Sequence, residues 1–256
     1  MSLKKTKLFL SDPQVLFREG IHFILSGEDD FEVIGEGISN EEALSHIETN
    51  PPQVIIINIA DNKLGGLELV HHLKRRSPSI SAILTLEDKD EEQLFEVLKS
   101  GASAYLTKDI DPERLLEIVR AVAQGGLPIL EEMLTPEVAT RTLAEFEEIN
   151  ELIGGTDSLM AGLTPKETQV LKTIAAGNGM EQVAAKLTTD EDSIRTELKQ
   201  ALNKLVANDQ TKAVIMTVQR SLPGVIGDLG RPTGFSKEYL TREEFDRFKD
   251  HLAKSL

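Results

Sequence analysis

The asparagine Asn58 follows a strongly apolar run, residues 54–57, which has the composition of a buried parallel strand. Sites in open α/β sheets form at the carboxyl ends of the strands, so residue 58 lies where chemistry is expected. An aspartate there could accept a phosphoryl group. The asparagine amide is a very poor nucleophile, and it brings no charge that would hold a metal ion.

The elements that position Asn58 alternate between strand and helix over the first 125 residues. Short apolar runs predict strands at residues 7–10, 31–35, 54–57, 80–84 and 104–106. Amphipathic segments predict helices at residues 15–25, 40–47, 67–73, 91–98 and 112–122, with Asn40 as an N-cap. Five successive strand–helix units predict an α/β fold with a five-stranded parallel sheet and helices on both faces.

The second half of the chain has a helical pattern throughout. A linker helix is predicted at residues 136–153, and Thr164-Pro165-Lys166-Glu167 combines three helix-start signals. Four short helices are predicted next, at residues 166–176, 180–187, 192–206 and 211–220. The turn near residues 188–190 is short, which is compatible with a helix-turn-helix.

These changes of pattern predict four parts of the chain. They are an α/β domain at residues 1–127, a linker helix segment at 128–161, a helix-turn-helix domain at 162–221 and a tail at 222–256. Within the tail, residues 221–236 predict irregular structure, and Thr241 opens an amphipathic helix. That helix would carry Phe245, Phe248 and Leu252 on one face.

Composition excludes several classes of function. The chain has 256 residues and no cysteine, which rules out disulfides and thiolate chemistry. We see no signal peptide and no run of about 18 apolar residues, so we expect a cytoplasmic protein without a membrane partner. The five histidines show no ligand spacing and no nucleophile motif is present, so we expect no metal, no cofactor and no enzyme activity.

Charge is distributed unevenly along the chain. The formal net charge is −15, yet residues 161–220 hold eight basic and seven acidic side chains, so the remainder carries −16. The acidic total argues against nonspecific coating of nucleic acid. The asymmetry predicts two domains with different partners.

Several sequence blocks together resemble the bacterial response regulators of the NarL/FixJ class. The blocks are LFREG at residues 16–20, GASAYLTKD at 101–109, LTPKE at 163–167 and Lys204-Leu205, and the resemblance covers about residues 5–221. It implies a flavodoxin-like receiver domain followed by an all-α, LuxR-type helix-turn-helix that binds double-stranded DNA. It also implies a homodimer, formed through the helix at 211–220.

The resemblance assigns a phosphorylation pocket in which this chain departs from the family. Paired carboxylates after the first strand and an aspartate after the third would hold Mg²⁺ and accept the phosphoryl group. This chain has Asp12 and Pro13 at the first place and Asn58 at the second. We therefore predict a receiver that does not use ordinary aspartyl phosphorylation. Asp61 is a weak candidate for a substitute acceptor.

Three further residues match the family pattern on the opposite side of this pocket. Thr85, Tyr105 and Lys108 stand where the switch threonine, the switch aromatic residue and the phosphate-binding lysine are expected. One interpretation is that Lys108 pairs with Asp12 and Asn58 in a satisfied polar cluster. The other is a retained switch that responds to another anion, a small ligand or a regulatory protein.

The resemblance also assigns DNA contacts. Arg195, Thr196 and Lys199 fall where base edges are read, and Ser193 and Lys204 fall near phosphates. The acidic residues at 190–192 suit a helix N-terminus, but Glu197 would repel phosphates. Two hypotheses follow: a phosphorylation-independent transcription regulator that binds DNA as a dimer, or an interaction adaptor without DNA affinity.

Overall fold

The structure, a computed structural model, describes residues 5–59, 65–152 and 161–221. Contacts divide the chain into two compact units, Met1–Glu132 and Met133–Leu256. The amphipathic helix predicted in the tail and the candidate acceptor Asp61 lie outside the described residues. Within the described residues, no helix is long and apolar enough to cross a membrane.

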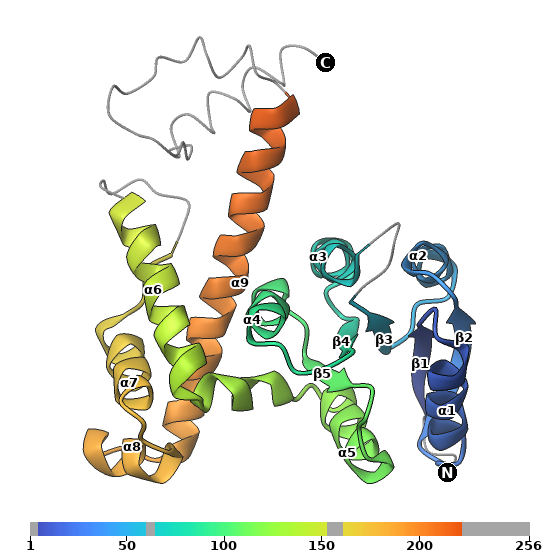
Figure 1. The fold of residues 1–256 in the computed structure, drawn as a ribbon, viewed down its shortest axis with the longest axis horizontal. Coiled ribbons are helices and arrows are strands. Elements are labelled where there is room, and N and C mark those ends of the chain that lie inside the picture. Colours follow the sequence, from blue (N-terminus) through green and yellow to red (C-terminus); the bar gives the residue numbers. More distant parts are fainter. Residues whose placement is uncertain (1–4, 60–64, 153–160, 222–256) are drawn as a thin grey trace. The chain divides into compact units, whose positions relative to one another are not determined.

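The first unit contains a parallel sheet of five strands in the order β2-β1-β3-β4-β5 (Figure 1). The strands are β1 (Thr6–Ser11), β2 (Phe31–Gly37), β3 (Val54–Asn58), β4 (Ser81–Leu86) and β5 (Ala104–Thr107). Each predicted strand is present, with ends that differ by up to two residues. The parallel sheet confirms the predicted α/β class, because strands that all run in one direction need a crossover after each of them.

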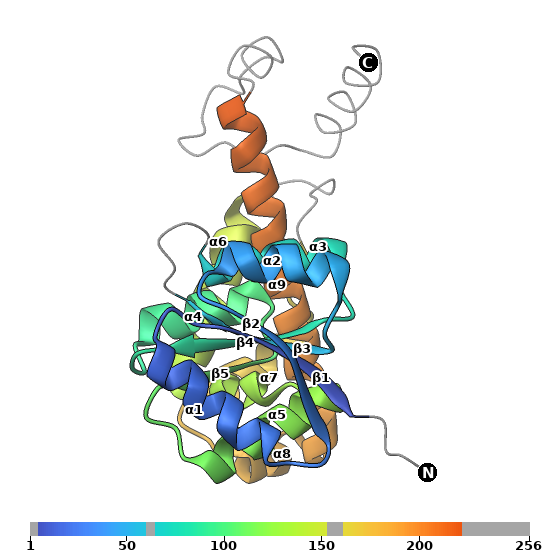
Figure 2. The ribbon, with the colours of Figure 1, turned by 90° about the vertical axis from the view of Figure 1, so that its right-hand side faces the viewer.

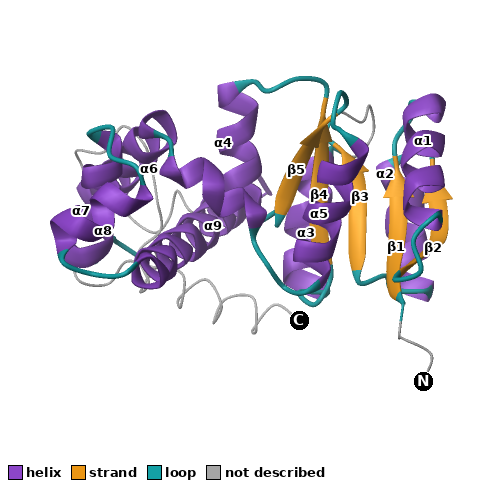
Figure 3. Cartoon of the chain, turned by 90° about the horizontal axis from the view of Figure 1, so that it is seen from below, coloured by secondary structure: helices purple, strands orange, loops and turns teal. Residues whose placement is uncertain are grey.

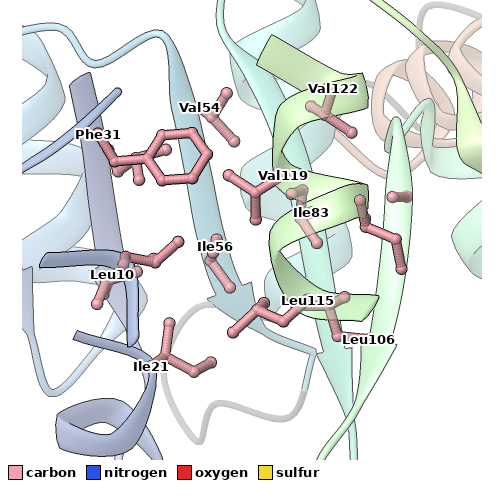
Figure 4. Close-up of a cluster of buried hydrophobic side chains, with 14 residues drawn as sticks. Leu10, Ile21, Phe31, Val54, Ile56, Ile83, Leu106, Leu115, Val119 and Val122 are labelled. Carbon is pink, nitrogen blue, oxygen red and sulfur yellow. The ribbon is translucent and has the colours of Figure 1, made fainter. Parts of the chain in front are cut away.

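Five helices cover the two faces of this sheet (Figures 2 and 3). They are α1 (Val15–Ser26), α2 (Asn40–Thr49), α3 (Gly66–Arg76), α4 (Glu91–Ser100) and α5 (Pro112–Ala123). Helices α1 and α5 pack on one face, where Ile21 and Leu115 join strand residues such as Leu10 and Ile56 in one buried cluster (Figure 4). Side chains from alternate strand positions form this cluster, as the two-residue period of a strand requires.

The N-cap of α2 differs from the sequence prediction. Ser39 is the cap, and its side chain accepts a hydrogen bond from the backbone N–H of Glu42. Asn40 is the first helical residue and is buried, with only 1% of its surface exposed. The prediction was wrong by one residue because serine and asparagine are nearly equal caps, and only the chain path decides which one is used.

The second unit is helical over its described residues. Its elements are α6 (Pro136–Leu152), α7 (Pro165–Ala175), α8 (Met180–Leu187) and α9 (Glu191–Ser221), and the short helix η1 (Pro128–Leu134) precedes them. Thr164 and Glu167 form the capping box that the sequence predicts at the start of α7. Thr188, at φ 52°, ends α8 in the left-handed conformation, which allows the short turn before α9.

The prediction of separate helices at residues 192–206 and 211–220 was wrong. Helix α9 runs unbroken through both ranges. No glycine or proline lies between Val206 and Thr211, so nothing local stops the helix. Asn208 is buried on this stretch, and its side chain exchanges two hydrogen bonds of 2.9 Å with the backbone of Ala161.

Candidate functional site

The predicted pocket residues meet at the carboxyl edge of the sheet. Asp12 follows β1, Asn58 ends β3, Thr85 lies in β4 and Lys108 follows β5. The first three residues are 4%, 3% and 1% exposed, and the Lys108 side chain is 10% exposed. Strands that run in parallel bring all four positions to one edge, although they are far apart in sequence.

The carboxylate of Asp12 is the centre of this cluster. Its Oδ1 accepts the backbone N–H of Gln14 at 2.8 Å. Its Oδ2 accepts the Asn58 amide at 2.9 Å and the Thr85 hydroxyl at 3.2 Å, and the ammonium of Lys108 lies 3.5 Å away. Three hydrogen bonds and one ion pair therefore surround this buried carboxylate.

Lys108 has a second and closer carboxylate partner. The Oε1 atom of Glu87 lies 2.7 Å from the Lys108 ammonium, and it also accepts the Gln14 side-chain amide at 2.8 Å. The ammonium additionally lies 5.4 Å from the centre of the Phe17 ring. Pro13 is exposed and offers no side-chain ligand.

A second set of polar contacts holds the backbone on which the pocket residues stand. Asn40 accepts the Ser11 hydroxyl and donates to the backbone oxygen of Asn58, both at 3.1 Å. Arg18 donates to the backbone oxygen of Asp12 at 2.6 Å and pairs with Glu36 at 2.9 Å. Burial opposes ionisation of Glu36, but hydrogen bonds from His22 and Arg18 outweigh it and hold the pKa of that carboxyl below its usual value.

The predicted DNA-contact residues of the second unit all lie in the first half of α9. The carboxylate of Asp190 accepts the backbone N–H of Ser193 at 2.7 Å, which caps the helix and lowers the pKa of Asp190. Arg195, Thr196 and Lys199 are exposed on one side of α9, whereas Ser193 is half-buried. Arg195 and Lys199 make no ion pair with any other described side chain.

Two lysines near α9 are held in ion pairs inside the second unit. Lys204 lies 2.7 Å from Glu167, whose side chain is fully buried, and Lys166 lies 3.0 Å from Glu197. The Glu197 side chain is only 13% exposed. The Glu197 charge is therefore compensated within the domain by Lys166. Residue spacing along the helix did not reveal this partner. The phosphate contact of Lys204 stays a prediction.

Comparison with known proteins agrees with this arrangement. Residues 8–120 match the model of the response regulator receiver domain, and residues 161–217 match that of the luxR family of bacterial regulatory proteins. DegU of Brevibacillus brevis, a transcriptional regulatory protein, is 32% identical over 222 residues, which is 84% of this chain and 94% of DegU. The chain belongs to the response regulators with a LuxR-type DNA-binding domain. The nitrate/nitrite response regulator NarL of Escherichia coli K12 is 28% identical over 215 residues, 84% of this chain and 96% of NarL.

In this response regulator, Tyr105 lies apart from the Asp12 cluster. Its hydroxyl donates to Glu132 of η1 at 2.9 Å, and Lys89 pairs with the same carboxylate at 2.9 Å. Burial, together with the Glu132 carboxylate, raises the pKa of the Tyr105 phenol. Tyr105 thus connects β5 of the receiver domain to the segment that leaves it.

Sequence reasoning missed three receiver residues that complete the pocket: Gln14, Asn40 and Glu87. Each lies within a few residues of a strand end at the carboxyl edge. That position was the available signal, because polar residues at this edge converge whatever their spacing along the chain. The hydrogen-bond partners of these three residues could not be predicted from the sequence, since they depend on the order of the strands in the sheet.

We expect the replacement Asp12→Ala to destabilise the receiver domain by about 2–4 kcal/mol, because the buried Asn58 amide and Thr85 hydroxyl lose a carboxylate acceptor and Lys108 loses one of its two carboxylate partners. Urea unfolding followed by circular dichroism measures this difference. The control Asp88→Ala removes an exposed carboxylate from the loop after β4 and should change stability by less than about 0.5 kcal/mol. Equal effects of the two replacements would contradict the role given to Asp12.

Proposed function

We propose that this response regulator is a DNA-binding transcription regulator whose receiver domain is not switched by phosphorylation of residue 58. The observation that carries this proposal is the 2.9 Å hydrogen bond from the Asn58 amide to Asp12. A hydrogen-bond donor stands where the family places a carboxylate nucleophile.

The chemistry of phosphoryl acceptance supports the same proposal. Mg²⁺ prefers near-octahedral oxygen coordination, and the attacking group in this family is an aspartate carboxylate. Asp12 is the one carboxylate among the residues that match the family's acidic set, and its donors would have to be displaced before it could bind a metal. The described residues contain no group of three or more acidic or histidine side chains placed to hold a metal ion.

Addition of beryllofluoride and Mg²⁺ should leave the amide NMR spectrum of the full chain unchanged, because residue 58 has no carboxylate to bind the fluoride complex. The double replacement Pro13→Asp and Asn58→Asp is the matched comparison, since it restores both missing carboxylates. This variant should show saturable shifts at Thr85 and Lys108. Saturable shifts of those residues in the unmodified protein would overturn the proposal.

DNA binding is proposed to occur through the exposed side of α9. Arg195 is the principal reader, because its planar fork matches the O6 and N7 atoms of guanine. Thr196 and Lys199 lie beside it on the same side, and Ser193 and Lys204 are the proposed phosphate contacts. The ion pairs of Lys166 and Lys204 reduce the positive charge available to phosphates, and this observation favours the alternative of an adaptor without DNA affinity.

The replacement Arg195→Ala should weaken binding to a selected DNA site by about 1–3 kcal/mol and relax the preference for one base pair. Selection of genomic fragments at low salt, followed by fluorescence anisotropy, measures both effects. Arg75→Ala is the control, because it removes the same charge from an exposed site on α3. If selection enriches no sequence, the adaptor replaces the transcription regulator as the better hypothesis.

We also propose that the regulator forms a homodimer. The helix segment expected to form the dimer is 211–220. From residue 213 onward its side chains are outside those that the structure describes. Additional support comes from α1, where Leu16 and Phe23 are 90% and 82% exposed. They are seven residues apart and so share one side of the helix, which leaves an apolar surface for a second copy to cover.

Sedimentation equilibrium should therefore show a dimer whose dissociation constant rises at least about tenfold with Phe23→Glu, because the replacement puts a charge into an apolar contact. Gln93→Glu adds the same charge on α4 and should leave the dissociation constant unchanged. A protein that is monomeric throughout, or equally affected by both replacements, would contradict the use of α1.

We further propose domain limits of 1–127, 128–161, 162–221 and 222–256, a cytoplasmic location where the DNA target is present, and no enzyme activity. The input to the receiver domain is then a regulatory protein or a small ligand. Limited proteolysis with mass spectrometry tests the proposed domain limits. Protected fragments that end inside one of the four ranges would contradict the limit given there.

A further inference from the structure

Lys108 is held more closely by Glu87 than by the buried Asp12. The Lys108 ammonium lies 2.7 Å from Glu87 Oε1 and 3.5 Å from Asp12 Oδ2. Glu87 comes from the loop after β4, and its side chain is 64% exposed, whereas the lysine side chain is 10% exposed. One carboxylate thus lies beneath the ammonium and another covers it from the solvent side.

The position of the Glu87 carboxylate is fixed from two separate segments. Its Oε1 accepts from Lys108 after β5 and from the Gln14 side-chain amide before α1. The backbone N–H of Gln14 donates to Asp12, so Gln14 joins the two carboxylates. A charged oxygen with two donors of this kind makes stronger hydrogen bonds than a neutral pair does.

We propose that Glu87 is a built-in anion that takes the place of an external oxyanion at Lys108. Its carboxylate oxygen occupies the solvent-side hydrogen-bonding position of the ammonium. This inference rests on the proposed function, because a receiver phosphorylated on residue 58 would need that position for the phosphoryl oxygens.

The charges in the pocket support this role. Asp12 and Glu87 contribute two negative charges against the one positive charge of Lys108, so a further anion would enter a site that is already negative. Removal of Glu87 leaves one charge of each sign and exposes an ammonium that lacks its nearest partner. The pocket would then accept a small oxyanion beside Lys108 and Gln14, the two donors that Glu87 now occupies.

The test is a titration of the full chain with inorganic phosphate, followed by amide NMR. The unmodified protein should show no saturable shift at Lys108 or Thr85. Glu87→Ala should bind phosphate with a dissociation constant in the millimolar range. This dissociation constant should be at least tenfold lower than any that is measurable for the unmodified protein. The double replacement Glu87→Ala and Lys108→Gln should lose this binding.

Asp88→Ala is the matched control, because it removes the neighbouring exposed carboxylate, for which no ion pair is seen among the described residues. Equal phosphate binding by Asp88→Ala and Glu87→Ala would overturn the proposal, since the effect would come from overall charge. Absence of binding by a folded Glu87→Ala protein would also overturn it, and urea unfolding verifies the fold.

The beryllofluoride experiment separates this inference from the proposed function. If beryllofluoride leaves the unmodified protein unchanged and Glu87→Ala still fails to bind phosphate, the role of Glu87 is wrong and the proposed function stands. If beryllofluoride produces saturable shifts in the unmodified protein, the proposed function fails, and the inference built on it fails too.

Discussion

The need to satisfy one buried carboxylate constrains the whole receiver domain. Asp12 is almost fully buried, and an ionised carboxylate away from water is costly unless donors surround it. Those donors come from three places besides its own loop: the end of β3, the strand β4 and the loop after β5. The sheet must therefore keep its order and register for Asp12 to be tolerated.

The replacement of a carboxylate by Asn58 fits this constraint. Two acidic groups at this distance would repel each other unless a metal ion lay between them. The Asn58 amide instead donates a hydrogen bond to Asp12, so these two side chains attract rather than repel each other. The amide of Asn58 supplies a donor where a carboxylate would supply only acceptors, and Lys108 pairs with Glu87.

Internal ion pairing also shapes the LuxR-type domain. Lys166 and Lys204 each pair with a carboxylate of their own domain, so the proposed phosphate contact of Lys204 competes with its pair to Glu167. Glu167 is fully buried and needs a cation, whereas Glu197 is only largely covered. The exposed positive charge on the early part of α9 comes from Arg195 and Lys199, beside the exposed acids Glu191 and Asp192, which makes base reading more important than phosphate attraction in the proposed binding mode.

The sequence by itself determined the alternation of strands and helices, the start of α7 and the absence of a carboxylate at residue 58. These features are local, because a strand, a cap or a single residue type is encoded within a few positions. It also brought Asp12, Asn58, Thr85 and Lys108 to one sheet edge, since that edge collects the carboxyl ends of all parallel strands.

Only the tertiary structure decided which polar groups pair. Gln14 bonds to Glu87, and Thr85 to Asp12, across 73 residues of chain in each case. Likewise, Ser39 rather than Asn40 caps α2, Glu197 has a cation partner, and α9 continues through the expected break. Such choices depend on which segments the fold brings within about 3 Å of each other, and no periodicity along the sequence records that distance.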